Sequence, residues 1–291
     1  MIDFSDIDYN CLKTWNLIGL GRTKGVFQLE THLGQSWAKR LKPSNLEELA
    51  ALVALLRPGC LKAIVDGKSL TQHYVDRKHK KDEITYIHPS LEEVLKPTQG
   101  ILIFQEQSLK IAQLLAGFNL QKADSLRKAI GKKQAGLMAE VKKSFLEGAE
   151  SKKIVTKEVA EEIFGIIEKS NRYSFNKSHA ISYAICAYWS AYAKAHHKLE
   201  FYCSYLRYAR EKINPQKEVR ELVSDAKLED ISIYPPSLNK LSTQFQINDN
   251  NIYFGIRDLK SVGTSHATKL LSVLESLPEL SKKSVDELSW Y

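Results

Sequence analysis

Apolar residues recur at the three- and four-residue spacing of amphipathic helices along most of the chain up to about residue 210. Ser44 and Glu47 have the spacing of a capping box, which starts the first clear helix, and Pro58-Gly59 ends it. The pattern predicts helices over 46–56, 70–79, 105–115 and 178–198, and a nearly continuous helical stretch over 119–171 with breaks near Gly131, Gly136 and 151–155.

Patterns typical of β-strands are few and short. The apolar patches at 17–21 and 26–29 indicate strand or turn, and 100–104 is a brief β-type run. Near the C-terminus, the strand candidates 244–247 and 252–255 flank Asn248-Asp-Asn-Asn251, which favours a hairpin turn. With helices expected over 216–227 and 264–277, the sequence predicts a mainly α fold with a small C-terminal α/β segment.

The helix expected over 178–198 carries a stripe of small residues. Alanines at 180, 184, 187, 191 and 195 fall on one face, with Ile181, Ile185 and Trp189 beside them. This face allows another element to approach the helix closely.

Composition fits a folded protein, with 43% hydrophobic and 26% charged residues. The four cysteines have neither metal-knuckle spacing nor the pattern of a disulfide framework. The chain shows no secretory signal and no apolar run long enough for a membrane span. We therefore expect a cytoplasmic protein without a membrane partner. The net charge of 42 − 34 = +8 favours an anionic partner.

Three short motifs are weak candidates for phosphate or metal binding. Gly67-Lys68-Ser69 resembles the end of a P-loop, but Lys62 stands where the first glycine should be. Asp6-Ile7-Asp8 matches a metal-binding D-x-D, although a surface turn fits it better. His196 and His197 are adjacent, so on a helix they point about 100° apart, which disfavours a shared metal ion.

The strongest charge signal lies over 121–153, where nine Lys and Arg face four Asp and Glu. Lys128 and Lys132 are one helical turn apart, Arg127 flanks them, and Gly131 would let a phosphate approach the backbone. A phosphate-binding face and an ordinary solvated face fit this stretch equally well.

The segment over 173–179 indicates a second anion site. Asn176 or Ser178 would cap the following helix, whose exposed N–H groups attract anions, and Lys177 and His179 add donors. A simple cap with an exposed His179 is the alternative. Arg57, held before Pro58-Gly59, suits bidentate contact with phosphate.

In this order, the motifs resemble the fingers region of the catalytic α subunit of bacterial DNA polymerase III, a C-family replicative polymerase. The matching residues cover nearly the whole chain: Gly25-Val-Phe-Gln-Leu-Glu30, Leu41-Lys-Pro43, 51–59, Arg77-Lys-His79, Tyr86-Ile-His-Pro89, Gln105-Glu-Gln107, Ile111-Ala-Gln113, 126–133, Phe175-Asn-Lys-Ser-His179, Lys194-Ala-His196, Glu200-Phe201, Pro235-Pro236, Asn239, Phe254-Gly255 and Leu259-Lys-Ser-Val-Gly263.

The resemblance implies a pre-fingers linker over 1–45, a helical fingers domain over 46–210, and a post-fingers segment over 211–291 that begins like a helix-hairpin-helix region. It implies contacts with the dNTP triphosphate or primer-template at Arg57, Arg127, Lys132, Lys133, Asn176, Lys177, Ser178 and His179. For DNA we also expect Lys128, Lys142, Lys143 and Lys260.

The chain also departs from the family. The palm aspartates of the family lie well before the GVFQLE motif, whereas 24 residues precede Gly25 here, and Asp6-Ile7-Asp8 aligns better with the pre-fingers linker. Smaller departures are Arg22, Cys60, Lys128, Ser174 and Ser261. Ser261 replaces a glycine of the hairpin, which counts against hairpin binding to DNA.

Three hypotheses follow: the fingers polypeptide of a split, phage-encoded polymerase, a non-catalytic replisome-binding or decoy protein, or a remnant. We favour the first, a part of a DNA-directed DNA polymerase that is inactive alone. Its expected partners are a palm-bearing polypeptide, primer-template DNA, dNTP, and a sliding clamp or other replisome proteins. The resemblance implies that Mg²⁺ in the assembled enzyme is held by the separate palm and not by this chain, which has no catalytic residue of its own.

Overall fold

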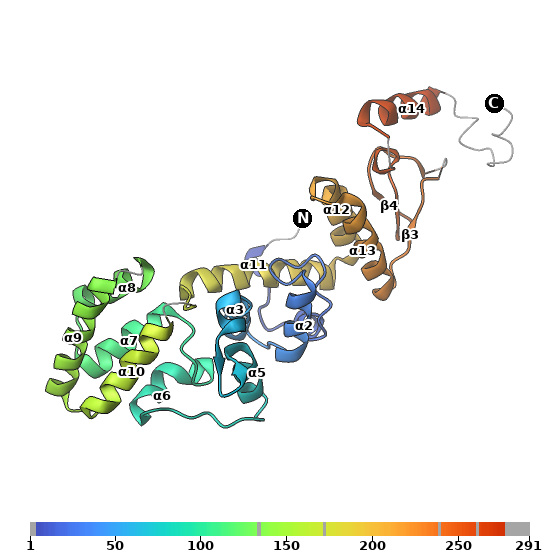
Figure 1. Cartoon of the computed structure of the whole chain (residues 1–291). Coiled ribbons are helices and arrows are strands. Elements are labelled where there is room, and N and C mark those ends of the chain that lie inside the picture. The colour runs from blue at the N-terminus through green and yellow to red at the C-terminus, as the bar shows by residue number, and fades with distance from the viewer. Residues whose placement is uncertain (1–3, 133–134, 171–172, 238–239, 260–261, 277–291) are drawn as a thin grey trace. The chain divides into compact units, whose positions relative to one another are not determined.

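The computed structural model describes residues 4–132, 135–170, 173–237, 240–259 and 262–276, and most of these are helical (Figure 1). The chain divides into two compact units, which we describe separately. The larger comprises Asp3–Thr23 and Phe27–Trp189, and the smaller comprises Met1–Ile2, Lys24–Val26 and Ser190–Tyr291. The expected mainly α fold with a small C-terminal α/β segment is confirmed.

The larger unit begins with short helices around a buried helix, α3. The elements are η1 (Phe4–Asp6), α1 (Leu12–Gly19), α2 (His32–Leu41), α3 (Leu46–Leu55), α4 (Pro58–Lys62), β1 (Ile64–Val65), β2 (Lys68–Ser69) and α5 (Leu70–Lys78). Asp66 and Gly67 turn the β1–β2 hairpin with φ angles of 47° and 78°, the left-handed pair that a tight hairpin requires. Gly67-Lys68-Ser69 is thus part of a hairpin.

A second group of helices encloses one apolar core (Figure 1). These elements are η2 (Pro89–Leu91), α6 (Glu92–Leu95), η3 (Lys96–Thr98), α7 (Gln105–Ala116), α8 (Leu120–Lys132), α9 (Ala135–Lys152) and α10 (Lys157–Ser170). Phe145 from α9 and Phe164 from α10 are fully buried, with ring centroids 5.2 Å apart. This core fixes α10, which leads to the segment over 173–179.

Helix α11 (Lys177–His196) confirms the expected alanine face. All five alanines are at most 2% exposed. On the same helix, Tyr188 lies 4.7 Å from the Trp15 ring of α1, and its hydroxyl donates to the Asp8 carbonyl at 2.8 Å. Small side chains therefore let the N-terminal segment of the chain pack directly on α11.

The smaller unit carries a three-stranded sheet. Its elements are α12 (Lys198–Tyr208), η4 (Ala209–Glu211), α13 (Pro215–Leu228), β3 (Ile233–Tyr234), β4 (Gln246–Asn248), β5 (Asn251–Tyr253), η6 (Ile256–Asp258) and α14 (Thr264–Ser276). The strand order is β3-β5-β4. Strands β3 and β5 are parallel, with Ile233 opposite Ile252, and β4 and β5 are antiparallel, with Gln246 opposite Tyr253. The hairpin expected at 248–251 is confirmed, with positive φ at Asp249 and Asn250.

A buried ion-pair network fastens α11 to α13 within the smaller unit. Lys194, fully buried, donates to Asp225 at 2.6 Å and to the Lys24 carbonyl at 2.9 Å. Burial lowers the pKa of Lys194, although Asp225 opposes this shift. For Lys24, burial lowers the pKa, but its hydrogen bond to Glu221 and its ion pair with Glu218 outweigh this effect and raise the pKa.

Gly25 begins the GVFQLE motif for a steric reason. Its φ is +77°, and a Cβ there would lie 3.0 Å from Cζ of Phe201. Any side chain at this position would meet both a strained backbone and the Phe201 ring.

The structure also bears on the predicted element boundaries. The apolar patch at 17–21 belongs mostly to helix α1, so the expectation of strand or turn there was wrong. Helix α8 ends at Lys132 and α9 begins at Ala135, so a helix boundary falls near Gly131 and Gly136 as expected. The domain boundary expected between 210 and 211 stays a prediction.

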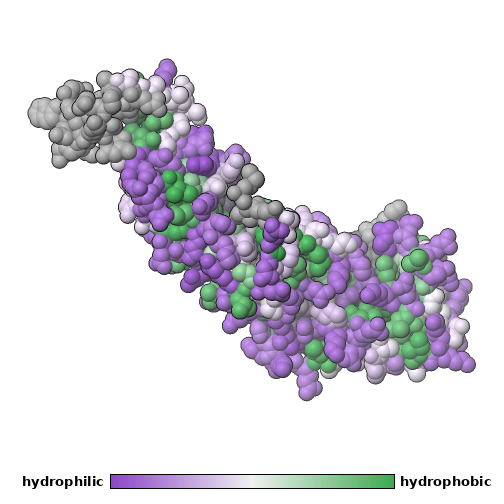
Figure 2. Space-filling model, turned by 180° about the vertical axis from the view of Figure 1, so that it is seen from behind, coloured by the Kyte–Doolittle hydropathy of each residue, from purple (hydrophilic) through white to green (hydrophobic). Residues whose placement is uncertain are grey.

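The surface seen in Figure 2 is mostly hydrophilic, with separate hydrophobic patches. In the described ranges, the structure contains no helix with the length and apolarity of a membrane span.

Candidate functional site

The candidate site is the start of α11, which two long-range hydrogen bonds position. Phe175 pairs with Phe104 in an isolated parallel bridge. Its N–H donates to the Ile103 carbonyl, and its carbonyl accepts from the Gln105 N–H, both at 2.9 Å. The bridge therefore places the first turn of α11 beside the first turn of α7.

Asn176 caps α11, as one of the two predicted caps. Its Oδ1 accepts from the His179 N–H at 2.8 Å, and its carbonyl accepts from the Ala180 N–H at 3.1 Å. Ser178, the other candidate, is exposed inside the first turn. The cap leaves the side chains of Lys177, Ser178 and His179 at one helix end.

A carboxylate already occupies this helix end. Glu106 of α7 accepts from Asn176 Nδ2 through Oε1 and from the Lys177 N–H through Oε2, both at 2.9 Å. The sequence reasoning expected exposed N–H groups here, but the Lys177 and His179 N–H groups are both satisfied. An anion at this position would have to displace or lie beside the Glu106 carboxylate.

Three aromatic side chains at four-residue spacing form a continuous face beside this end. His179 lies between Phe175 and Tyr183, with ring-centroid distances of 5.3 and 4.0 Å. Phe27, from the GVFQLE motif, lies 5.1 Å from Tyr183 and is 40% exposed. We call Phe27, Phe175, His179 and Tyr183 the aromatic face; it presents rings that can stack on planar ligands.

Arg57 completes the site from a distant part of the chain. Arg57 directly precedes α4, and its guanidinium carbon lies 4.4 Å from the Phe175 ring centroid. Nη1 of Arg57 is buried and has no hydrogen-bond partner among the described residues. A buried N–H without a partner costs about 1–3 kcal/mol, so an oxygen ligand at this atom would be stabilising.

Burial also affects the thiol beside Arg57. Cys60 is fully buried, and this raises its pKa to about 11, although the positive charge of Arg57 lowers the pKa in part. The thiol is therefore neutral near pH 7 and is no nucleophile.

The structure thus brings together five of the predicted phosphate-binding residues, namely Arg57, Asn176, Lys177, Ser178 and His179. Lys177 Nζ lies 3.5 Å from Glu47, a loose ion pair. Sequence reasoning missed Glu106, Phe27 and Tyr183 as members. The four-residue spacing of 175, 179 and 183 was the available signal for Tyr183.

The predicted cations on α8 and α9 have other neighbours. Arg127 and Lys128 both bind Asp124, at 2.7 and 2.8 Å, and these bonds lower the pKa of Asp124. Lys142 lies 3.7 Å from Glu168.

In the described part of the chain, the hydrogen bonds and ion pairs of these cations do not reach the aromatic face. Lys143 is exposed. The side chain of Lys132, together with Lys133 and Lys260, lies outside the described residues.

Two residues of the Arg77-Lys-His79 motif, Lys78 and His79, contact the end of α2, whereas Arg77 donates to the Gln99 carbonyl at 2.9 Å. Lys78 donates to the carbonyls of Leu41 and Lys42 at 3.1 and 2.6 Å and pairs with Glu48 at 2.8 Å. His79 Nε2 lies 2.8 Å from the Arg40 carbonyl. Lys78 therefore satisfies carbonyls that the helix end leaves without partners, and His79 lies within hydrogen-bond distance of another.

The weaker motifs also have structural neighbours. Asp8 accepts the Asn10 N–H at 2.8 Å, as in a surface turn, and His196 stacks on Tyr192 at 4.3 Å. Across the ranges that are described, no three His, Cys, Asp or Glu residues gather as metal ligands. The described carboxylates therefore do not form a cluster that fits two Mg²⁺ ions.

Comparison with known proteins gives consistent matches. Residues 1–153 match the family described as the bacterial DNA polymerase III alpha subunit finger domain. The DNA polymerase III subunit alpha of Aquifex aeolicus is 41% identical over 267 residues, which are 91% of this chain and 22% of that protein.

Two further relatives with the same name cover a similar share. That of Bacillus subtilis is 36% identical over 277 residues, 95% of this chain and 24% of the relative. That of Escherichia coli K12 is 38% identical over 268 residues, 90% of this chain and 22% of the relative. The chain thus spans less than a quarter of the length of these relatives, and it belongs to the bacterial DNA polymerase III alpha subunit family, of which it carries the finger region.

Proposed function

We propose that this chain acts as the fingers part of a DNA polymerase during DNA replication in the cytoplasm, binding the triphosphate of the incoming dNTP and the primer-template. The observation that carries the proposal is the unsatisfied, buried Nη1 of Arg57 beside Phe175. A guanidinium presents paired donors that match phosphate oxygens. Lys177, Ser178 and His179 supply further donors at the adjoining helix end.

The aromatic face supports the nucleic-acid side of this proposal. His179 and Phe27 are exposed, and their rings continue those of Phe175 and Tyr183. Stacking on an aromatic side chain contributes about 1–3 kcal/mol per base. Phosphate donors and a stacking surface side by side suit a nucleotide better than a simple anion.

In this proposal the chain positions the substrate and the chemistry is completed elsewhere. Phosphoryl transfer requires alignment and neutralisation of phosphate charge more than covalent help. The Mg²⁺ ligands would come from a palm-bearing polypeptide, so we expect no primer extension by the chain alone. A sliding clamp or another replisome protein would join the assembly.

The test is a titration of the pure chain with dATP, in which isothermal calorimetry measures the affinity. Arg57→Gln should weaken binding by about tenfold, the loss of one charge-assisted hydrogen bond. Arg220→Gln is the matched control, because Arg220 is exposed on α13 and contacts no predicted site residue in the described ranges. Equal affinities for wild type and Arg57→Gln would refute the triphosphate assignment.

Partners are identified by a pull-down with the tagged chain from source cells and mass spectrometry. A co-purifying polypeptide with palm carboxylates, together with primer extension by the pair, would support the polymerase proposal. Recovery of replisome proteins without a palm chain would favour a non-catalytic or decoy role instead.

A further inference from the structure

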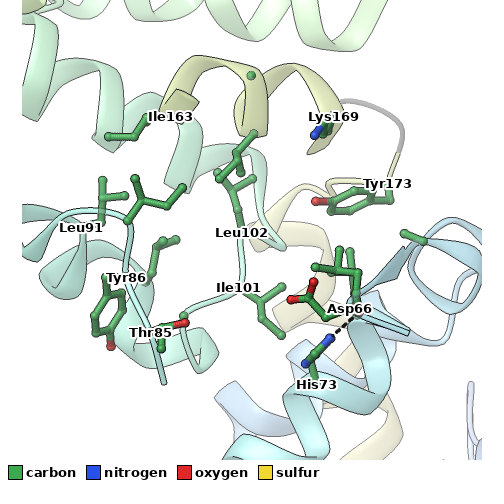
Figure 3. Close-up of a pocket in the computed structure, with 18 of the residues that line it drawn as sticks. Asp66, His73, Thr85, Tyr86, Leu91, Ile101, Leu102, Ile163, Lys169 and Tyr173 are labelled. Atoms are coloured by element: carbon green, nitrogen blue, oxygen red, sulfur yellow. Dashed lines mark hydrogen bonds between the residues drawn. The ribbon is translucent and has the colours of Figure 1, made fainter. Parts of the chain in front are cut away.

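A large cavity lies in the larger unit, apart from the aromatic face. Its volume is about 1220 Å³, and it is bounded by α4, the β1–β2 hairpin and α5 on one side and by α10 on the other (Figure 3). Sites for small molecules usually have roughly 300–1,000 Å³. The cavity therefore has room for an organic molecule of substantial size.

The walls are mostly apolar. Leu91, Ile101, Leu102 and Ile163 are buried along the inner wall. Ile64, Val65 and Ile87 also line the cavity and are 62%, 47% and 36% exposed. Exposed apolar residues that gather around a hollow are typical of a binding site.

A few polar groups interrupt this apolar lining. Lys62 and Lys169 are exposed at the rim, and neither forms an ion pair with a described residue. Arg77 also lines the cavity, and its buried Nε has no hydrogen-bond partner in the described part of the chain. Two carboxylates, those of Asp66 and Glu162, also line the cavity, so the named cations outnumber the carboxylates by three to two. The donors suit an anionic group better than a cationic one.

Gly165 keeps part of the cavity open. It lies within α10, where glycine is less favourable than alanine, and a Cβ there would meet no atom within 4 Å. Close packing therefore does not explain this glycine. Its missing side chain enlarges the space that the cavity offers.

We propose that this cavity binds a small amphipathic anion, whose flat apolar body lies against Ile101 and Leu102 and whose carboxylate, sulfonate or phosphate meets Lys62, Lys169 and Arg77. In Figure 3, Lys169 and Tyr173 lie on one side of Ile101 and Leu102, and Leu91 and Ile163 on the other. Pro58, Gly59 and Tyr173 of the wall are close neighbours in sequence of Arg57 and Phe175. A ligand in the cavity would therefore contact residues that adjoin the candidate site in sequence, and its binding is proposed whether or not that site binds nucleotide.

The test uses anilinonaphthalene sulfonate as the probe, titrated into the 291-residue chain and followed by fluorescence. Saturable binding at one site is expected. Gly165→Leu should occupy part of the cavity beside α10 and weaken binding by about tenfold. Gly136→Leu is the matched control, since this helical glycine also faces open space but does not line the cavity. Non-saturable binding, or equal affinity of the two folded variants, would overturn the proposal.

A second pair of variants tests the anionic group without altering the apolar wall. Lys62→Gln together with Lys169→Gln should weaken binding roughly threefold, the effect of removing exposed charges. Lys157→Gln, on α10 but outside the cavity, should leave it unchanged.

Uncharged phenylnaphthylamine should bind the wild type more weakly than the sulfonate does. Wild-type affinity in the double variant would refute the anion assignment, and this result remains decisive if Gly165→Leu does not fold.

Discussion

At the scale of single residues, two features define the start of α11: a buried donor without a partner and a carboxylate that accepts two hydrogen bonds. Arg57 Nη1 is buried without a hydrogen bond, whereas the Glu106 carboxylate satisfies Asn176 Nδ2 and the Lys177 N–H. The local sequence could predict the Asn176 cap, because a cap depends on residues within one turn. It could not predict Glu106, which lies 70 residues away in the chain and arrives through the Phe104–Phe175 bridge.

Glu106→Gln should strengthen dATP binding by severalfold. The amide retains an oxygen acceptor for the helix end and removes a negative charge that would repel phosphate. Calorimetry on the pure chain measures the change. The control is Glu93→Gln, the same substitution in the first turn of α6. Weaker binding by Glu106→Gln than by the control would contradict the expected repulsion.

Cys60 should resist alkylation in the folded chain at pH 8. The thiol is buried and burial raises its pKa to about 11, so the reactive thiolate is scarce. The exposed Cys186 is the internal control and should react with iodoacetamide. Mass spectrometry of the labelled peptides distinguishes the two sites, and early labelling of Cys60 would be inconsistent with this burial.

The same shift links Cys60 to stability. The folded-state pKa lies above the unfolded value, so the unfolded thiolate is favoured as pH rises above about 9. The contribution of Cys60 to stability is therefore complete below pH 9 and decreases toward pH 11.

At the scale of helices, glycines in one element have opposite roles. Gly148 of α9 approaches α7 so closely that a Cβ would lie 2.2 Å from the Ala116 carbonyl oxygen. Gly136, on the same helix, faces open space. The sequence shows two helical glycines, and only packing distinguishes them.

Gly148→Ala should destabilise the chain by about 1–3 kcal/mol, because the methyl group forces α9 away from α7. Gly136→Ala should stabilise it, by up to about 1 kcal/mol, through helix propensity alone. Urea denaturation followed by circular dichroism compares the two variants. A stabilising effect of both substitutions would show that α9 and α7 can separate freely.

The helices themselves were predictable where periodicity was strong, and their ends where capping was local. The box expected at Ser44 and Glu47 is displaced by one residue: Asn45 Oδ1 accepts the Glu48 N–H, and Glu48 accepts the Ser44 N–H. The two patterns have the same spacing, so sequence alone does not choose between them. Helix α1 was missed because its C-terminal part was interpreted as a short apolar patch at 17–21, typical of strand or turn.

At the scale of the whole molecule, the net charge of +8 favours a polyanionic partner. The structure reduces the effective charge in part of the basic stretch, since Asp124 binds both Arg127 and Lys128. Charge counting along the sequence could not reveal this pairing. The DNA-binding residues therefore remain predictions.

Binding of the chain to primer-template DNA should weaken steeply with salt. Each phosphate contact contributes about −0.9 to the slope of log K against log salt, because counterions are released. Fluorescence anisotropy over a series of salt concentrations measures the slope. Asp124→Asn should steepen it, since Arg127 and Lys128 would lose their internal partner, and Glu93→Gln controls for the change in net charge. A flat response to salt would show that these cations are simply solvated.

The parallel bridge between Phe104 and Phe175 has a mechanical consequence. The bridge holds the first turns of α7 and α11 together, and Glu106 of α7 accepts a hydrogen bond from the first turn of α11. Helix α7 also contributes to the apolar core of α6–α10. A ligand that displaced Glu106 would therefore weaken a contact between α11 and a helix of that core. The amide protons of Phe175 and Gln105, which close the bridge, would then exchange faster with solvent. Ligand binding at the start of α11 would thus also change the stability of the bridge and of the core that α7 joins.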